Sequence, residues 1–298
     1  MTKKLDTATK TLRAIARKEA NLQRKAFAAR NTVVAKAVAK AVRKSVTKAV
    51  RKANSKPTGF VIYQGPSLLD GMPIVVIATL KSRNGKTGNM IQTWIIRSDV
   101  SPLEASRMGL DSSICGNCPH RGIATYAETG VAADRSCYVD IGRSVMAIYK
   151  TYIKGRYPTA AGHAAIAAIG KGRKVRLGAY GDMSAAPYYV AESLISDSDG
   201  HTAYSHQSGN SESSYNPALY MISADSAESA QTAWNNGART FRVVSDYSEM
   251  VDGKEIACPS IRGVHCIDCG LCDGTSRHPN AKSIAIVVHG AGAKHFTG

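Results

Sequence analysis

Seven cysteines in two groups are the residues of this chain whose type and spacing most clearly indicate chemistry. The first group, Cys115, Cys118 and Cys137, comes from the segments SSICGNCPHRG and RSCYVDIG. The second, from ACPSIRGVHCIDCGLCDG, consists of Cys258, Cys266, Cys269 and Cys272. Because a two-residue gap lets a short turn point two thiolates at one centre, both groups predict a bound metal or cluster. Burial as a small apolar side chain explains an isolated cysteine better than it explains this grouping.

The sequence does not decide whether the bound group is Zn²⁺ or a [4Fe–4S] cluster, because thiolates bind both. The four cysteines of the second group could close a tetrahedral zinc site, and so could three of them with His265, His278 or His289. The repeated gap, with Pro259 directly after Cys258, is also typical of cysteine runs that bind a cluster. The first group has only three cysteines. Either His120 completes a zinc site there, or one position stays open and makes a reactive centre.

Polar residues that end apolar segments are the candidates for catalysis. GAYGD ends at Asp182, AYSHQ contains His206, and MISADS contains Asp225. In α/β proteins the carboxyl ends of the strands carry the site, so these three residues are the predicted catalytic group. The alternative is that Asp182, Asp225 and Asp246 cap the helices that follow them, which is a common role of aspartate.

Apolar segments typical of strands alternate with helical segments after residue 58, which predicts an α/β fold with a parallel sheet. About eight strands in 241 residues suit a (β/α)8-like barrel, whose usual size is ~250 residues, and an open doubly wound sheet is the alternative. The barrel would carry the cysteine-rich metal site near its C-terminus. Strands are expected at 74–80, 91–97, 137–142, 174–181, 202–207, 219–225, 240–246 and 283–290. Helices are expected at 143–155, 162–172, 186–196 and 226–237.

A basic arm, residues 1–57, precedes this domain of residues 58–298. The arm holds seventeen lysines and arginines against two acids, whereas the rest of the chain holds 22 basic and 20 acidic residues. Its segment AKAVAKAVRKSVTKAVRK (35–52) would place lysines and valines on opposite faces of a helix. The arm therefore predicts phosphate contacts with a nucleic acid, most simply DNA. The expected contact residues are Lys36, Lys40, Arg43, Lys44, Lys48, Arg51 and Lys52. A solvated tail, a membrane-surface helix and an organelle transit peptide are the alternatives.

Other function classes are disfavoured by the sequence. The longest apolar segment, PIVVIATL (73–80), is far shorter than the ~20 residues of a membrane span. No apolar signal segment follows Met1, so a cytoplasmic protein is expected. NGKTG (84–88) contains Gly-Lys-Thr, but a phosphate-binding loop needs a glycine where Leu80 stands. An NTPase is therefore rejected.

Several motifs together resemble a family of uncharacterised tailed-phage proteins: GPSLLDGMPIVVIATL, KTGNMIQTWIIR, SSICGNCPHRG, CYVDIGRS, GAYGD, AYSHQ, TFRVVS and CGLCDG. For such a protein the cytoplasm would be that of the host cell. Strands followed by a late cysteine cluster also resemble, more distantly, the queuine/archaeosine transglycosylases, which are zinc-containing barrels that exchange guanine for a 7-deazaguanine. That resemblance implies Asp182 and Asp225 as nucleophile and base. Here the cysteines read Cys-x-x-Cys-x-x-Cys, whereas the transglycosylase motif is Cys-x-Cys-x-x-Cys. The CxxC…CY element resembles one found in phage radical-SAM-like proteins. The chain lacks the Cys-x-x-x-Cys-x-x-Cys signature of radical-SAM enzymes.

Three functions follow as hypotheses. The first is a phage enzyme that modifies DNA by transglycosylase-type base exchange, with the target base flipped out of the duplex. The second is an iron–sulfur enzyme in which Cys115, Cys118 and Cys137 hold a cluster with one open iron. The third is a zinc-stabilised nucleic-acid-binding protein without catalysis.

Overall fold

The computed structural model describes residues 17–19, 21–25, 29–30, 32–45, 56–82, 84–290 and 292–297. Two compact units, residues 1–56 and residues 57–298, make up the chain. In the first unit every described residue from 17 to 45 is helical and exposed. Lys36, Lys40, Arg43 and Lys44 lie on this helix. The other three predicted contact residues, Lys48, Arg51 and Lys52, lie outside the described residues.

The second unit contains two five-stranded sheets, and the first of them mixes strand directions. Its strands follow chain order: β1 (Gly59–Pro66), β2 (Pro73–Thr79), β3 (Ile91–Arg97), β4 (Lys174–Tyr180) and β5 (Gly200–Thr202). β1, β2 and β3 are antiparallel, with Val76 opposite Ile95, whereas β3, β4 and β5 are parallel. Parallel strands need long crossover connections, and helices fill those connections here.

All five strands of the second sheet are parallel. Their order is β6 (Tyr204–Ser205), β7 (Met221–Ala224), β8 (Thr240–Val244), β10 (Ser283–Val287) and β9 (Glu255–Ala257). Only Ala203 separates β5 from β6, so one extended segment pairs with β4 in the first sheet and with β7 in the second. The two sheets are therefore joined through this segment.

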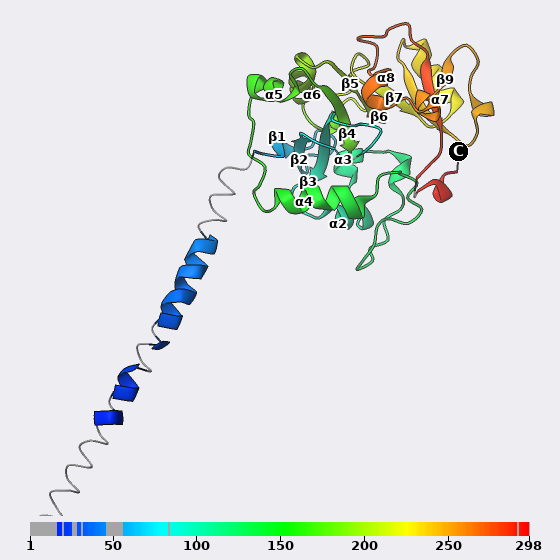
Figure 1. Ribbon diagram of the computed structural model, residues 1–298. Coiled ribbons are helices and arrows are strands. Elements are labelled where there is room, and N and C mark those ends of the chain that lie inside the picture. The colour runs from blue at the N-terminus through cyan, green and yellow to red at the C-terminus, as the bar shows by residue number, and fades with distance from the viewer. Residues whose placement is uncertain are drawn as a thin grey trace, which may run out of the picture. The chain divides into compact units, whose positions relative to one another are not determined.

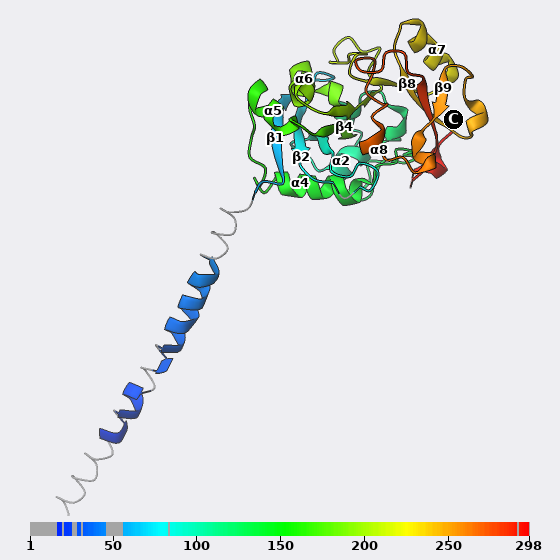
Figure 2. The same ribbon diagram turned by 45° about the horizontal axis from the view of Figure 1, so that its top comes forward.

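Helices cover both faces of the first sheet. α5 (His163–Gly170) and α6 (Tyr188–Ser196) lie on one side, and α2 (Pro102–Arg107) and α4 (Met146–Tyr152) lie on the other (Figures 1 and 2). Sheets buried on both faces have nearly continuous apolar strands, and β2 fits, with Ile74 to Ala78 fully buried. Burial of each such large aliphatic side chain stabilises the fold by roughly 1.5–3 kcal/mol.

Helix α7 (Ala227–Asn235) packs beside β7 and β8 and starts at a local capping signal. The Ser226 side chain accepts from the backbone N–H of Ser229, and the Ser229 side chain bonds back to the backbone of Ser226. This reciprocal cap satisfies two N–H groups that a helix start leaves free. Ser226, the residue directly after Asp225, thus provides the cap, which leaves the Asp225 side chain available for another contact.

The predicted α/β class is confirmed, but the predicted (β/α)8-like barrel is not confirmed. The strands of the described residues make two sheets with β1 and β9 at their outer edges. The predicted strand 137–142 is wrong, because residues 137–140 are irregular and Ile141–Val145 is a π-helical turn before α4. Arg135 Nη1 donates to the carbonyls of Cys137 and Val139, so a side chain takes the acceptors that a neighbouring strand would use.

Among the described residues, no helix combines the length and the hydropathy that crossing a bilayer requires.

Candidate metal centre

A cavity of about 630 Å³ opens at the carboxyl ends of the parallel strands. Its walls include Asp182 after β4, His206 after β6, Asp225 after β7 and His289 after β10. Ligand sites of α/β sheets are found at this edge, and small-molecule sites usually measure ~300–1,000 Å³. The cavity therefore has the position and the size of a small-molecule site.

Three potential ligand atoms converge in this cavity. Nε2 of His206 lies 3.2 Å from Oδ1 of Asp225, and Nε2 of His120 lies 3.5 Å from the same oxygen. All three atoms lie within 4.8 Å of one another. A tetrahedral ion with bonds of ~2.0–2.1 Å to its ligands separates the ligand atoms by about 3.4 Å. The spacing of these side chains therefore suits one bound metal ion.

Hydrogen bonds orient this group, and the charge of its carboxylate is balanced by imidazole protons that a metal ion would have to displace. Nδ1 of His120 lies 2.8 Å from Ser136 Oγ, which orients the ring as the outer hydrogen bonds of metal-binding histidines commonly do. Burial alone would lower the pKa of His206, but an ionised Cys118 and the Asp225 carboxylate raise it to about 10. Burial would raise the pKa of Asp225, but hydrogen bonds from His120 and His206 hold it well below its usual range. A metal ion would take the place of the imidazole protons.

The first cysteine group lines the same cavity. Cys115 ends α3 (Ser112–Cys115), Cys118 precedes the turn Pro119–Arg121, and Cys137 lies in the irregular segment before α4. Cys118 Sγ lies 3.9 Å from Nε2 of His206, so the thiols border the histidines. Burial is the main cause that raises the pKa of Cys115 and Cys137, and an ionised Cys118 would raise both further. The three sulfurs are thus close enough to interact.

Gln207 supports the loop that carries Cys115 and Cys118. Its Nε2 donates to the carbonyl of Cys115 at 3.0 Å and to Asn117 Oδ1 at 3.2 Å. Gly116 has φ +56°, and a Cβ added there would lie 2.2 Å from Gln207 Oε1. Only glycine combines this backbone conformation with this close approach. The SHQ segment therefore carries a cavity-facing histidine and, next to it, the residue that holds the cysteine loop.

Asp182 has a structural role in this arrangement. Its Oδ1 accepts from the backbone N–H and the hydroxyl of Ser184, at 3.0 and 2.8 Å. Its Oδ2 accepts from Ser205 Oγ at 2.8 Å and from the backbone N–H of His206 at 3.1 Å. Burial raises the pKa of Asp182, although these donors oppose the shift. The carboxylate therefore caps one turn and positions His206, and its acceptor sites are already used.

Like Asp182, Asp246 caps the turn that follows it, whereas Asp225 does not act as a cap. Asp246 accepts from the backbone N–H of Ser248 and begins the turn Tyr247–Glu249. Asp225 precedes the cap of α7, and its carboxylate faces His120 and His206 instead. Of the three aspartates for which capping was the alternative, Asp225 is the one whose side chain contacts the imidazoles.

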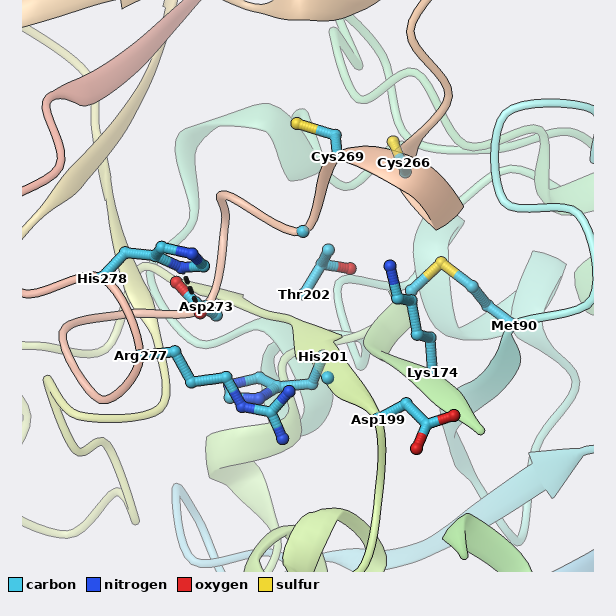
Figure 3. A pocket seen from close by; sticks show the side chains of 12 residues that line it. Met90, Lys174, Asp199, His201, Thr202, Cys266, Cys269, Asp273, Arg277 and His278 are labelled. Atoms are coloured by element: carbon cyan, nitrogen blue, oxygen red, sulfur yellow. Dashed lines mark hydrogen bonds and ion pairs between the residues drawn. The ribbon is translucent and has the colours of Figure 1, made fainter. Parts of the chain in front are cut away.

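Two cysteines of the second group, Cys266 and Cys269, line a smaller cavity of about 120 Å³. Cys266 and Cys269 project from the short helix α8 (Cys266–Cys269), with the His278–Asp273 pair on one side and Lys174 on the other (Figure 3). Cys258 and Cys266 also line the large cavity. Burial raises the pKa of Cys272 to about 12, and ionised neighbours in the group would add to this.

Neither cysteine group is drawn together as tightly as one zinc ion requires. A zinc ion with Zn–S bonds of ~2.3 Å sets its sulfurs about 3.8 Å apart. Among the described residues, no three cysteine sulfurs lie within 4.8 Å of one another. The buried thiols must also lose their protons before they bind a metal. Metal binding would therefore be coupled to a local contraction of these loops.

The structure thus brings all three predicted catalytic residues, and the first cysteine group with them, to one cavity. Cys258 and Cys266 reach it as well, whereas Cys269 and Cys272 do not line it. His120, considered in the sequence only as a fourth ligand of the first cysteine group, instead faces Asp225. Arg176 was not predicted, and its signal was a charged residue inside the apolar strand KVRLGAY. Gln207 belongs to the polar strand end AYSHQ, but its role in holding the cysteine loop was not predicted.

Comparison of the chain with protein-family models, with curated proteins and with solved structures found no significant match, so the resemblances drawn from its motifs stay predictions.

Proposed function

We propose that the chain is a metal-dependent enzyme that acts on a small organic substrate in the large cavity. The observation that carries the proposal is the convergence of His120, His206 and Asp225 within 4.8 Å at the strand ends. Two imidazoles and one carboxylate are a ligand set that leaves coordination positions open for substrate or water. An ion bound there would polarise a substrate oxygen or lower the pKa of a bound water.

The chain's own residues would orient this centre. Ser136 fixes the ring of His120, and Asp182 fixes the backbone at His206. Cys118, 3.9 Å from His206 Nε2, is close enough to supply a fourth ligand after a small movement. A mixed set of sulfur, nitrogen and oxygen ligands favours a transition metal such as zinc or iron over magnesium or calcium.

A second candidate is the iron–sulfur enzyme with an open cluster iron. The observation that favours it is that Cys115, Cys118 and Cys137 all line the cavity although their sulfurs are not drawn together around one small ion. The corners of a cluster hold their cysteines further apart than a single zinc ion does, and the fourth iron would face the cavity. His120, His206 and Asp225 would then surround the substrate.

The transglycosylase hypothesis receives less support. A nucleophilic carboxylate needs a free oxygen, whereas Asp182 accepts four hydrogen bonds and is buried. Asp225 remains as a candidate base, but it faces two imidazoles. A flipped DNA base remains a substrate class to test in this cavity. The fold that we propose for such an enzyme is an open, barrel-like arrangement of the two joined sheets.

Two further parts belong to the proposal. The second cysteine group would hold a structural zinc, because its four thiols come from one short segment after β9. The basic arm would bind nucleic acid through the exposed lysines and arginine of its helix, Lys36, Lys40, Arg43 and Lys44.

The test is the metal content of full-length protein purified without oxygen, measured by mass spectrometry with an ultraviolet–visible spectrum. The single variants His120→Ala, His206→Ala and Asp225→Ala should each lose one equivalent of metal. His289→Ala is the matched control, because His289 lines the same cavity but lies outside the three-residue group. It should keep the metal of the wild type.

The same measurement separates the two candidates. Iron with sulfide, lost in Cys115→Ser, Cys118→Ser and Cys137→Ser but kept in the histidine variants, would establish the cluster and reject the His–Asp centre. Metal content unchanged in all six variants would reject both.

A further inference from the structure

Among the charged residues that line the large cavity, the acids all have partners, whereas one arginine has no acidic partner. Its three acids are all engaged: Asp111 with Arg121, Asp182 with four donors, and Asp225 with two histidines. Arg176, by contrast, lines the cavity with no carboxylate within 4.0 Å among the described residues. The cavity therefore presents a cation without a carboxylate partner among the described residues.

Arg176 is held in place by an aromatic residue rather than by an acid. It stands on β4, its Nη2 donates to the hydroxyl of Tyr138, and its guanidinium carbon lies 5.9 Å from the centre of the Tyr138 ring. Its Nε is buried and has no hydrogen-bond partner among the described residues. A buried donor without a partner costs free energy, and a guanidinium offers a planar fork that matches an oxyanion.

The surroundings of Arg176 add to this preference. Lys86, His265 and His289 also line the cavity, and the His289 ring stacks on Tyr138 with centroids 6.1 Å apart. Tyr138 itself is 48% exposed, so an aromatic surface lies open beside the guanidinium. The positive charges of Arg176 and Lys86 next to an exposed ring suit a ligand with both an anionic and a planar part.

We propose that Arg176 recognises an oxyanion, a carboxylate or a phosphate ester, on the substrate of this cavity. The inference deepens the proposed function, since it names the substrate class of the same cavity. Arg176 would be a specificity-determining residue that binds the anionic end of the substrate.

Binding to full-length protein, as purified with its metal, tests the inference by calorimetry. The probes are phenyl phosphate and benzoate, with benzyl alcohol as the uncharged ring. At least one anion should bind more tightly than the alcohol by about tenfold or more, and Arg176→Gln should remove this difference. Which anion is preferred distinguishes a phosphorylated substrate from a carboxylated one. Arg176→Lys should recover only part of the affinity, because it keeps the charge but not the fork.

Controls separate recognition from structure. Arg156→Gln, which removes the same charge at an exposed position, should bind the anions like the wild type. Equal anion binding in Arg176→Gln and wild type would overturn the inference. So would loss of metal from Arg176→Gln, because Arg176 also interacts electrostatically with Cys266 and would then be the counter-charge of a metal-binding thiolate. His120→Ala should still bind the anion in an Arg176-dependent way, so failure of the metal proposal and failure of this inference give different results.

Discussion

The side chain of Gln207 occupies the space next to Gly116, at a point where a Cβ would lie 2.2 Å from the glutamine Oε1. Residues 91 positions apart in the chain thus fix the shape of the cysteine loop together. The strand end that supplies His206 and the loop that supplies Cys118 are joined by this contact, so the geometry of the cavity depends on a residue that takes no part in chemistry.

Gly116→Ala should therefore destabilise the protein. The added Cβ would clash with the Gln207 side chain, and alanine would have to adopt the existing backbone φ of +56°, which it rarely does. We expect a loss of about 1–3 kcal/mol in the free energy of unfolding, measured by chemical denaturation. Gly209→Ala is the control, because a Cβ there meets nothing within 4 Å. Equal stability of the two variants would mean that Gln207 moves aside freely.

Asp182→Asn should act on stability rather than on chemistry. An amide nitrogen would meet donors that now approach the carboxylate from Ser184, Ser205 and the backbone of His206. The expected loss is about 1–3 kcal/mol in the free energy of unfolding, since a buried polar group loses its partner. Asp246→Asn, at an exposed cap, should cost ~1 kcal/mol or less. A fully stable Asp182→Asn protein that lacks base-exchange activity would instead support the transglycosylase hypothesis.

Cys269→Ser should remove the metal of the second cysteine group. The backbone carbonyl of Cys272 accepts from the N–H of Ala203, so this loop is tied to the segment that joins the sheets. We expect loss of about one metal ion per chain and a lower melting temperature, with the metal of the large cavity retained. Ile261→Ala, at an exposed position in the same segment, serves as the control for a residue that is not a predicted ligand. If Cys269→Ser melted at the same temperature as the wild type, the proposed structural role of this metal would be wrong.

The arm should account for the salt dependence of DNA binding. Replacing Lys36, Lys40 and Lys44 by glutamine in the full chain should weaken binding to a duplex irrespective of its sequence. The slope of log K against log salt should become less negative by about 0.9 for each phosphate that the variant no longer neutralises. A triple variant of exposed lysines in the body, Lys150→Gln, Lys154→Gln and Lys171→Gln, changes the charge equally and should leave the slope unchanged. Similar effects of the two variants would show that only net charge matters.

Sequence patterns predicted the buried elements well, because their signal is local. β2 and β3 are nearly continuous apolar runs, and both lie within one residue of their predicted ends. The segment after Cys137 also reads as a strand, yet Arg135 takes its carbonyls and the chain stays irregular. β1 was not predicted, although it pairs with β2 as a hairpin across residues 67–72; glycines and a proline, Gly59, Gly65 and Pro66, weaken its strand pattern.

The candidate site was predictable in kind but not in arrangement. Spacing identified both cysteine groups, and strand-end positions identified Asp182, His206 and Asp225. The meeting of His120 with Asp225, 105 positions later, follows from the packing of a loop against two strand ends, which no local pattern encodes. The same holds for the four donors on Asp182, which separate its role from that of Asp225.

The segment that runs from β5 through Ala203 into β6 has a consequence for how the second unit unfolds. One sheet cannot release this segment without exposing an edge of the other, because neighbouring residues of a single extended segment pair with both. Ala203 also accepts from the N–H of Met221, which extends the link into β7. Residues 57–298 should therefore melt in one cooperative transition, with both sheets and both cysteine loops unfolding together.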